Sequence, residues 1–231
     1  MKHLYYLLFT LSIGFAQVPN VWWVDGTSGN DNNNGQSEST AFKTIQTIFK
    51  NNYLSAYNDT IYVKEGTYDF KDAKLDVYIG FVIVGVSGAE KTIFDAGSEN
   101  RHFYLDISFN NKDKGYKQKF EGISFIKGYD AGQGGSIRTG SYANVYFNGC
   151  IFENNQSQYQ GGAIYSSGGI DINSTVFKNN KAILSTGSNQ SGALHITDTG
   201  SNRISAVIKN SKFIGNFTQA KYDAVGGAAS I

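Results

Sequence analysis

The chain has 231 residues, 20 basic and 19 acidic side chains, and a formal net charge of +1. This length suffices for one all-β domain with a buried core. The near-neutral charge excludes nucleic acid and anionic membrane surfaces as partners attracted by bulk electrostatics. Glycine provides 27 residues and proline only 1, which is typical of a turn-rich, β-leaning protein. The single cysteine, Cys150, excludes an internal disulfide and any multi-cysteine metal site.

Residues 1–16 have the pattern of a secretory signal peptide. Lys2 and His3 precede an apolar run that ends in Gly14-Phe-Ala16, with small residues at the −3 and −1 positions. The run is shorter than the ~20 residues of a membrane span, and no later stretch approaches that length. A buried N-terminal strand or helix is the alternative. We therefore predict an exported protein without an integral membrane span, whose lone thiol is buried rather than reactive.

Residues 17–60 are predicted to form an N-terminal cap. Residues 21–24 read as a short strand, and residues 26–39 are almost entirely Gly, Asn, Ser, Asp and Thr. Over residues 42–49 the apolar side chains fall on one face of a short helix, for which Ser39 or Thr40 is the expected N-cap. These side chains are Phe42, Ile45, Ile48 and Phe49. Such a helix suits a plug over the open end of a stacked β core.

The loop at residues 30–35 loosely resembles a calcium loop. Its sequence is Asn-Asp-Asn-Asn-Asn-Gly, but Ala41 stands at the twelfth position, where a calcium loop of this kind carries a bidentate Glu. Calcium therefore stays a weak possibility, and a solvated loop is the favoured interpretation.

A repeat begins near residue 120. In each copy a large apolar residue is followed five positions later by Phe, with a turn-prone residue between them. The copies are residues 120–125, 147–152, 172–177 and 208–213, and the turn-prone residues are Gly122, Gly149, Ser174 and Asn210. Three positions after each Phe comes Gly128, Asn155, Asn180 or Asn216, a residue that tolerates left-handed backbone geometry. A small, Gly-containing element follows at residues 134–137, 161–164, 191–194 and 226–229.

These repeats predict an all-β solenoid over residues 61–231. The intervals between successive Phe residues are 27, 25 and 36 residues, and each unit holds three short apolar blocks without helical periodicity. Three short strands per coil, each coil about 4.8 Å from the last, make a single-stranded parallel β-helix. Residues 60–63, 77–86 and 91–95 are expected to form irregular first coils. A β-sandwich with chance spacing is the alternative.

Two columns of identical side chains follow from this fold. Phe125, Phe152, Phe177 and Phe213 are expected to stack as an inward aromatic column. Asn155, Asn180 and Asn216 are expected to stack at a corner, where amide ladders bond from coil to coil.

The pairing of Gly161-Gly-Ala-Ile164 with Phe152-Glu-Asn-Asn155 resembles the repeat of chlamydial polymorphic outer-membrane proteins. The opening, through residues 23–27, 41–45 and 59–63, is similar to the start of secreted right-handed β-helix proteins of the pectate-lyase-like superfamily. The first resemblance implies a surface-exposed, adhesion-linked protein at the cell outer membrane. Since residues 226–231 open another coil, we expect either a longer chain or docking of the last coil on another chain.

Outward positions of the Gly-led strands suggest a binding surface. Arg138, Tyr165 and His195 are predicted to point outward and to line up, which favours contact with a polysaccharide or protein ligand. For His195 the alternatives are a metal ligand or general base, helped by His102, and a solvated strand histidine.

No catalytic or metal site emerges from the sequence. Glycosidases need two carboxylates about 5–9.5 Å apart, yet Asp171 is expected to lie between Tyr146 and Val207. Glu153 and Lys178 give an acid–base pair rather than two acids. Loops remain able to bring Asp130, Asp198 or Asp223 together. No cofactor is predicted.

Three functional interpretations remain. The first is a non-enzymatic exported surface or adhesin-like protein that contacts carbohydrate or protein. The second is a polysaccharide lyase, a glycoside hydrolase or a carbohydrate-binding relative of these enzymes. The third is a structural spacer within a larger secreted assembly.

Overall fold

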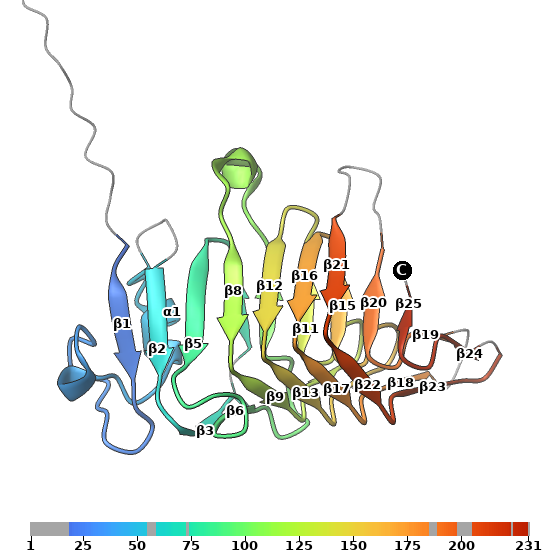
Figure 1. The fold of residues 1–231 in the computed structure, drawn as a ribbon, viewed down its shortest axis with the longest axis horizontal. Coiled ribbons are helices and arrows are strands. Elements are labelled where there is room, and N and C mark those ends of the chain that lie inside the picture. Colours follow the sequence, from blue (N-terminus) through green and yellow to red (C-terminus); the bar gives the residue numbers. More distant parts are fainter. Residues whose placement is uncertain are drawn as a thin grey trace, which may run out of the picture.

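The computed structural model describes residues 19–54, 59–72, 74–184, 189–197, 205–222 and 224–230. The predicted signal peptide lies outside these residues and stays a prediction. All pairings between the described strands are parallel. The chain descends along the near side in Figure 1, turns back beneath and rises along the far side while advancing from left to right. This path is a right-handed parallel β-helix, which confirms the predicted fold.

Three long sheets, which we name A, B and C, form the walls of the solenoid, and each coil visits them in that order. Sheet A consists of β1 (Val21–Val24), β2 (Asp59–Val63), β5 (Phe81–Gly85), β8 (Gln118–Glu121), β12 (Asn144–Asn148), β16 (Gly169–Asn173) and β21 (Ala206–Lys209). Sheet B consists of β3 (Gly66–Asp69), β6 (Thr92–Asp95), β9 (Ser124–Ile126), β13 (Ile151–Glu153), β17 (Val176–Lys178) and β22 (Lys212–Ile214). Sheet C consists of β4 (Leu75–Val77), β7 (Phe103–Leu105), β11 (Ile137–Thr139), β15 (Ile164–Ser166), β20 (Leu194–Ile196) and β25 (Ala229–Ser230).

Additional short strands appear between sheets B and C from the third coil onward. One set is β10 (Tyr129–Asp130), β14 (Gln156–Ser157), β18 (Lys181–Leu184) and β23 (Phe217–Ala220). The other is the pair β19 (Asn189–Gln190) and β24 (Ala224–Val225). The early coils therefore hold the three expected strands, and the later coils add a fourth and a fifth.

Residues 77–86, which we expected in the first coils, do not form a single strand. The segment contains the end of β4 in sheet C and all of β5 in sheet A, separated by a corner at residues 78–80. A continuous apolar run cannot show where a coil changes sheets. The early coils are also fully paired, since β2 joins β5 and β5 joins β8 in continuous register.

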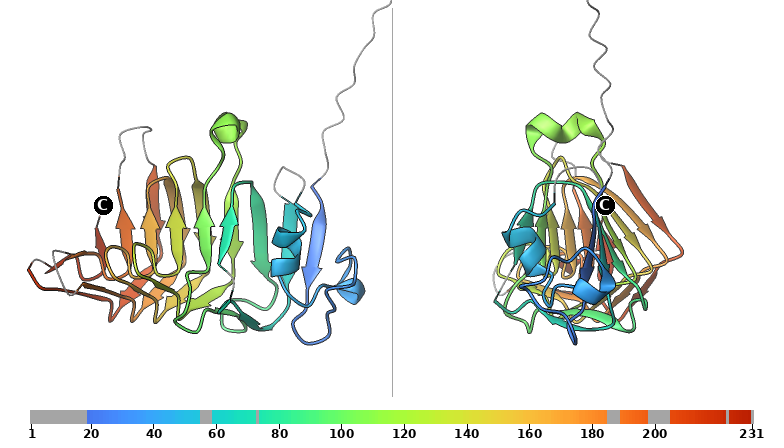
Figure 2. Two further views of the ribbon diagram at one scale, coloured as in Figure 1. Left: turned by 180° about the vertical axis from the view of Figure 1, so that it is seen from behind. Right: turned by 90° about the vertical axis from the view of Figure 1, so that its left-hand side faces the viewer.

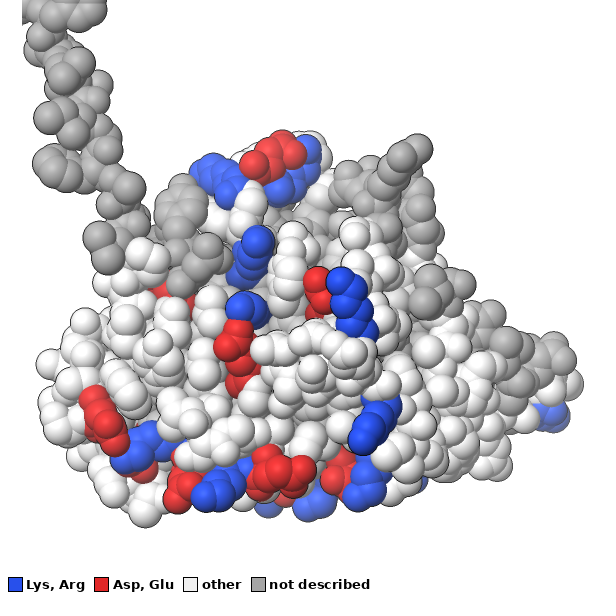
Figure 3. All heavy atoms as spheres, in the orientation of Figure 1, with Lys and Arg blue, Asp and Glu red and all other residues white. Residues whose placement is uncertain are grey.

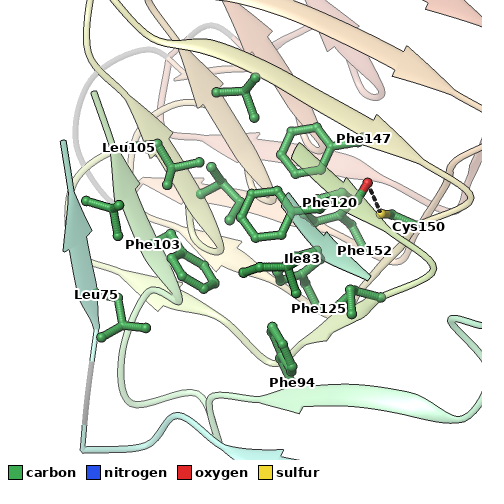
Figure 4. Close-up of a cluster of buried hydrophobic side chains, with 14 of the residues drawn as sticks. Leu75, Ile83, Phe94, Phe103, Leu105, Phe120, Phe125, Phe147, Cys150 and Phe152 are labelled. Carbon is green, nitrogen blue, oxygen red and sulfur yellow. Dashed lines mark hydrogen bonds between the residues drawn. The ribbon is translucent and has the colours of Figure 1, made fainter. Parts of the chain in front are cut away.

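The interior is filled by aromatic columns (Figure 4). In sheet B, Phe152 lies parallel to Phe125 at 4.8 Å between ring centroids and to Phe177 at 5.1 Å. Phe177 in turn stacks on Phe213 at 4.7 Å, with 4° between the rings. The strand register continues the column from Phe125 to Phe94, whose ring meets that of Phe125 edge-on. This continuous apolar interior supplies the burial that stabilises the coils.

A second column, of asparagines, closes the corner after sheet B. Asn155, Asn180 and Asn216 occupy equivalent positions in successive coils, and the first two are fully buried. The Oδ1 atom of Asn216 accepts hydrogen bonds from the backbone N and Nδ2 of Asn180, both at 2.9 Å. Each Nδ2 also donates to the carbonyl of the Phe in the preceding coil. The ladder thus satisfies the polar backbone of a buried corner.

Left-handed backbone occurs one residue before Gly128 and before each of these asparagines. Positive φ falls on Lys127, Asn154, Asn179 and Gly215. Each Asn of the column must direct its side-chain amide inward to bond the neighbouring coils. The exposed residue before it therefore adopts the left-handed conformation that makes the turn.

The cap at the N-terminal end differs in detail from its prediction. The helix α1 spans Gln46–Lys50, shorter than the expected residues 42–49. Ser39 and Thr40 belong to a separate 3-10 turn, η1 (Glu38–Thr40), and do not cap α1. Phe42 instead forms a parallel bridge to Val24. Backbone pairing with β1 therefore takes precedence over the helical spacing of residues 42–45.

The helix α1 nevertheless packs against the end of the interior. Ile45 and Ile48 are fully buried, and the Phe49 ring meets those of Phe81 and Phe103 edge-on at 5.8 and 6.1 Å. The right-hand view of Figure 2 looks onto this end of the solenoid and shows α1 lying across it. A helix satisfies its own backbone hydrogen bonds, so it covers apolar side chains without offering another strand edge.

Candidate binding surface on sheet C

The outer face of sheet B is occupied by matched charges. Lysines and carboxylates of neighbouring coils form ion pairs, and charged side chains alternate along the lower edge in Figure 3. The pairs are Glu65–Lys91 at 3.6 Å, Asp95–Lys127 at 2.9 Å and Glu153–Lys178 at 2.8 Å. Because these groups neutralise each other, the face offers little net charge to a ligand.

The outer face of sheet C carries the predicted row. Pairing places Arg138 beside Tyr165, and Tyr165 beside His195. The same register continues to Tyr104 and Asp76 in the earlier coils. The alignment of the internal repeats did not identify Tyr104 and Asp76, because their coils lack the Gly-led element before the strand. The strand Phe103–Leu105, with an apolar residue on each side of Tyr104, is the signal that identifies the position.

Arg138 and Tyr165 form a stacked pair on this face. The guanidinium carbon of Arg138 lies 5.9 Å from the centre of the Tyr165 ring, within the range of a cation–π contact. Both side chains are half-buried. In the part of the chain that the structure describes, no carboxylate lies within ion-pair distance of Arg138. Its donors are therefore available on the surface.

His195 continues the stack, but it is buried and is therefore not the solvated strand histidine that the sequence left as one alternative. Its ring lies 5.4 Å from that of Tyr165 at an angle of 18°, and only 6% of the residue is exposed. Nδ1 is 3.4 Å from the Ser191 hydroxyl. Burial lowers the pKa of His195, which favours the neutral ring at pH 7.

His102 does not join His195. It is fully buried within the solenoid, with Nε2 2.9 Å from the Phe94 carbonyl and Nδ1 3.0 Å from the Ser136 hydroxyl. Burial lowers its pKa to about 4. His102 is thus a neutral packing group inside the core, whereas His195 lies on the outer row of sheet C.

A buried ion pair stands beside the row. Arg101, two residues before β7, contacts Asp130 at 3.1 Å and donates to the Gln133 carbonyl at 3.0 Å. Burial lowers the pKa of Arg101, while Asp130 opposes that shift and nearby Arg138 adds to it. Asp130 is therefore the ion-pair partner of Arg101 and not a member of an acid cluster. Asp198 and Asp223 lie outside the described residues.

Sheet A presents Asp171 on its outer face. Asp171 pairs in register with Tyr146 on one side and with Val207 on the other. The nearest acid in the adjoining row, Glu121, is ion-paired with Lys119. Among the described residues this row brings no second carboxylate beside Asp171, and no group of three potential metal ligands forms.

The side chains of the Asn-rich loop accept hydrogen bonds from the backbone of the loop itself and of the segment just before α1. The Asp31 carboxylate accepts hydrogen bonds from the backbone N of Lys43 and Thr44, at 2.9 and 2.8 Å. The side-chain oxygens of Asn30 and Asn34 accept bonds from backbone N–H groups two residues ahead. These contacts hold the loop against the start of α1 and engage the side-chain oxygens of Asn30, Asp31 and Asn34.

Comparisons with known proteins agree with one coil of this architecture. Residues 149–167 match the Chlamydia polymorphic membrane protein repeat, a segment that contains β13, β14 and β15. No curated protein matches the chain significantly. Within the described residues no helix is long and apolar enough to cross a membrane.

Two solved structures are similar at a low level. They are a pectin methylesterase in complex with hexasaccharide VII and the pectin methylesterase PemA from Erwinia chrysanthemi. Each is 14% identical, covers 86% of this chain and 67% of its own, and has a TM-score of 0.37. A likeness at that level gives no information on activity.

Proposed function

We propose that the protein is a non-enzymatic, exported surface protein that contacts carbohydrate through the outer row of sheet C. The observation that carries this proposal is Arg138, a surface guanidinium that is stacked on Tyr165 and has no ion-pair partner among the residues that the structure describes. A protein ligand is the alternative occupant. The signal-peptide pattern and the polymorphic membrane protein repeat support export to the cell surface.

The row suits an extended acidic sugar chain. Tyr104, Arg138 and Tyr165 follow one another along the solenoid axis, about 4.8 Å apart from coil to coil. Tyrosine rings offer flat apolar area, and the guanidinium fork matches a carboxylate or sulfate group. Because all three side chains stand on paired strands, binding orders little of the backbone. These properties favour a polysaccharide with acidic groups.

Binding of polygalacturonate and alginate, measured by isothermal titration calorimetry, tests the proposal. Tyr165→Ala and Arg138→Gln are each expected to weaken binding about tenfold or more, since aromatic stacking and charge-assisted bonds are lost. Arg138→Lys keeps the charge but not the fork, and should give an intermediate loss. Lys178→Gln on sheet B is the matched control. Unchanged binding in both Tyr165→Ala and Arg138→Gln would contradict this proposal.

An enzymatic role is the second candidate, because Asp171 is a half-buried acid beside Tyr146. The same two polymers serve as substrates. Our proposal expects no release of reducing ends or unsaturated products. Turnover that disappears in Asp171→Asn would establish the enzyme instead.

A further inference from the structure

An arm formed by residues 106–117 rises from the edge between sheets C and A, at the top of Figure 1. It contains the 3-10 helix η2 (Phe109–Lys114), which Gly115 ends with φ of 68°. Both ends of the arm are anchored, because Ile107 and Tyr116 are buried, with 2% and 6% exposed. The arm therefore has a defined position on the solenoid.

Two polar side chains fix the base of the arm to neighbouring coils. The Oδ1 atom of Asp106 accepts hydrogen bonds from the backbone N of Ile107 at 2.9 Å and of Tyr142 at 3.1 Å. Gln118, fully buried, donates from Nε2 to the carbonyls of Asp106, Val77 and Ile79 at 3.0, 3.2 and 3.2 Å. The arm and the loop that carries Tyr142 are thus held in a fixed relation.

The tip of the arm exposes an aromatic pair. Phe109 is 63% exposed and meets the Tyr142 ring edge-on at 5.6 Å. Lys112 places its ammonium 5.4 Å from the centre of the Phe109 ring. A large apolar side chain that is held on an anchored arm and left uncovered indicates a contact surface.

An open surface groove of about 340 Å³ is lined in part by the arm. Its lining includes Lys112 and Asp113 from the arm, Tyr142 and Asn144 from the next coil, Gly169, and Ser205. We call this feature the edge groove. Lys112 and Asp113 form an ion pair at 2.9 Å, so the two charges of these lining residues cancel. Gly169 adds no side chain to the lining.

We propose that the edge groove binds a neutral sugar unit of a polysaccharide. Tyr142, with Phe109 beside it, supplies the aromatic wall for one face of the sugar ring. Asn144, Ser205 and the Lys112–Asp113 pair supply donors and acceptors for hydroxyl groups. This site is separate from the sheet C row and does not depend on it.

The chemistry of the groove selects this class of ligand. A balanced ion pair gives no excess charge to hold an anion. Hydroxyl, amide and charged groups at the lining disfavour a purely apolar ligand, since they would lose water without gaining partners. A polyhydroxylated ring satisfies these groups and still presents a C–H face to Tyr142.

The test uses neutral hexaoses of glucose, mannose, galactose and xylose, with binding to the whole chain measured by saturation-transfer NMR and calorimetry. At least one is expected to bind, with an affinity that Tyr142→Ala lowers about tenfold or more. Tyr142→Phe keeps the ring and should stay within about threefold. Gly169→Leu should abolish binding by filling the groove. Its Cβ would lie 3.3 Å from the Asn144 Oδ1 atom, so the Asn144 amide must shift by a few tenths of an ångström to accept the new side chain.

Circular dichroism establishes that each variant is folded. Tyr165→Ala separates the two surfaces, because it is expected to weaken binding of the acidic polymer and to leave hexaose binding unchanged. If no hexaose binds, or if folded Tyr142→Ala and Gly169→Leu bind as the unaltered chain does, the proposal is wrong. Capture of a protein at the arm that Gly169→Leu abolishes, without hexaose binding, would also overturn it.

Discussion

The Oδ1 atom of Asn180 accepts two hydrogen bonds from Asn155 of the preceding coil, from the backbone N at 3.0 Å and from Nδ2 at 2.9 Å. One carboxamide therefore serves both a buried backbone donor and a buried side chain. The Nδ2 group of Asn180 meanwhile donates to the Phe152 carbonyl at 2.8 Å. This bonding makes the corner of each coil depend on the next.

Replacement of Asn180 by Ala should therefore destabilise the solenoid strongly. The substitution leaves the Asn155 backbone N–H and the Phe152 carbonyl without these partners in a buried corner. At about 1–3 kcal/mol for each of these two unpaired buried groups, we expect the free energy of unfolding to fall by about 2–6 kcal/mol. Urea unfolding followed by circular dichroism measures the change.

A second asparagine ladder in the same coils provides the control. Asn173 donates to Asn148 at 2.9 Å and accepts from Asn210 at 3.1 Å, but these bonds are exposed to solvent. Water can replace them, so Asn173→Ala should lower stability by less than about 1 kcal/mol. Equal losses from the two variants would show that burial is not what makes the inner ladder important.

The aromatic column predicts a gradient in stability. Phe152 has parallel rings on both sides, so Phe152→Ala should lower the free energy of unfolding by about 3–5 kcal/mol. Phe213 is only partly buried, and within the described residues it stacks on Phe177 alone. Phe213→Ala should therefore lower the free energy of unfolding by about half as much, near 2 kcal/mol. Thermal and urea unfolding of both variants measure the difference.

Phe152→Leu separates volume from ring stacking. Leu keeps most of the apolar contact, so its loss of stability should be less than half that of Ala. A Phe213 variant as unstable as the Phe152 variant would contradict the gradient.

Stability should fall between pH 7 and pH 5 because of His102. Burial lowers its pKa to about 4 in the folded protein from an ordinary value of 6.5. Below pH 6.5 the unfolded chain therefore binds a proton that the folded chain does not, and unfolding becomes more favourable. The expected loss is about 2 kcal/mol between pH 7 and pH 5, levelling off below pH 4. Urea unfolding at a series of pH values measures it.

His102→Gln should remove most of this dependence while lowering stability at pH 7. A smaller slope should remain, because burial also lowers the pKa of His195. If the unaltered protein were equally stable at pH 5 and pH 7, the neutral buried state of His102 would be wrong.

The regular coils were predictable because two requirements repeat in their sequence. The first requirement is a residue with left-handed backbone two positions before each sheet B strand. The second is an Asn after the strand whose side chain bonds the equivalent Asn of the neighbouring coils. Gly122, Gly149, Ser174 and Asn210 all have positive φ, as this pattern needs. The earlier coils meet the same packing requirement differently. Phe94 pairs in register with Phe125, but no Asn follows it, so its place in the column depends on strand pairing.

The sheet C row was predictable in part for the same reason. Arg138, Tyr165 and His195 follow a Gly-led element that fixes their register, whereas Tyr104 and Asp76 do not. The burial of His195 was missed because it depends on neighbours such as Tyr165 and Ser191, which alternation along one strand does not reveal. The edge groove depends on the arm, and the sequence there has no repeat to compare.

Cys150 provides a probe of how the coils open. It is 1% exposed, its Sγ atom lies 3.5 Å from the Phe120 carbonyl, and burial raises its pKa to about 12 (Figure 4). The folded protein should therefore not react with Ellman's reagent at pH 8, since the thiolate is the reactive form. In denaturant, one thiol per chain should react. Reaction in the folded state at the rate of a free thiol would contradict the buried position.

The same thiol connects opening of the core to the asparagine ladder. Cys150 lies in the corner before β13, one strand away from Asn155. If the ladder holds neighbouring coils together, Asn180→Ala should increase the fraction of molecules in which the coils are open. The labelling rate of Cys150 in water should rise by the same factor, about a hundredfold for a loss of ~3 kcal/mol in the free energy of unfolding. Asn173→Ala should leave the rate within about fivefold. A stability loss in Asn180→Ala without faster labelling would mean that the corner opens while the core around Cys150 stays closed, so that coils separate one sheet at a time.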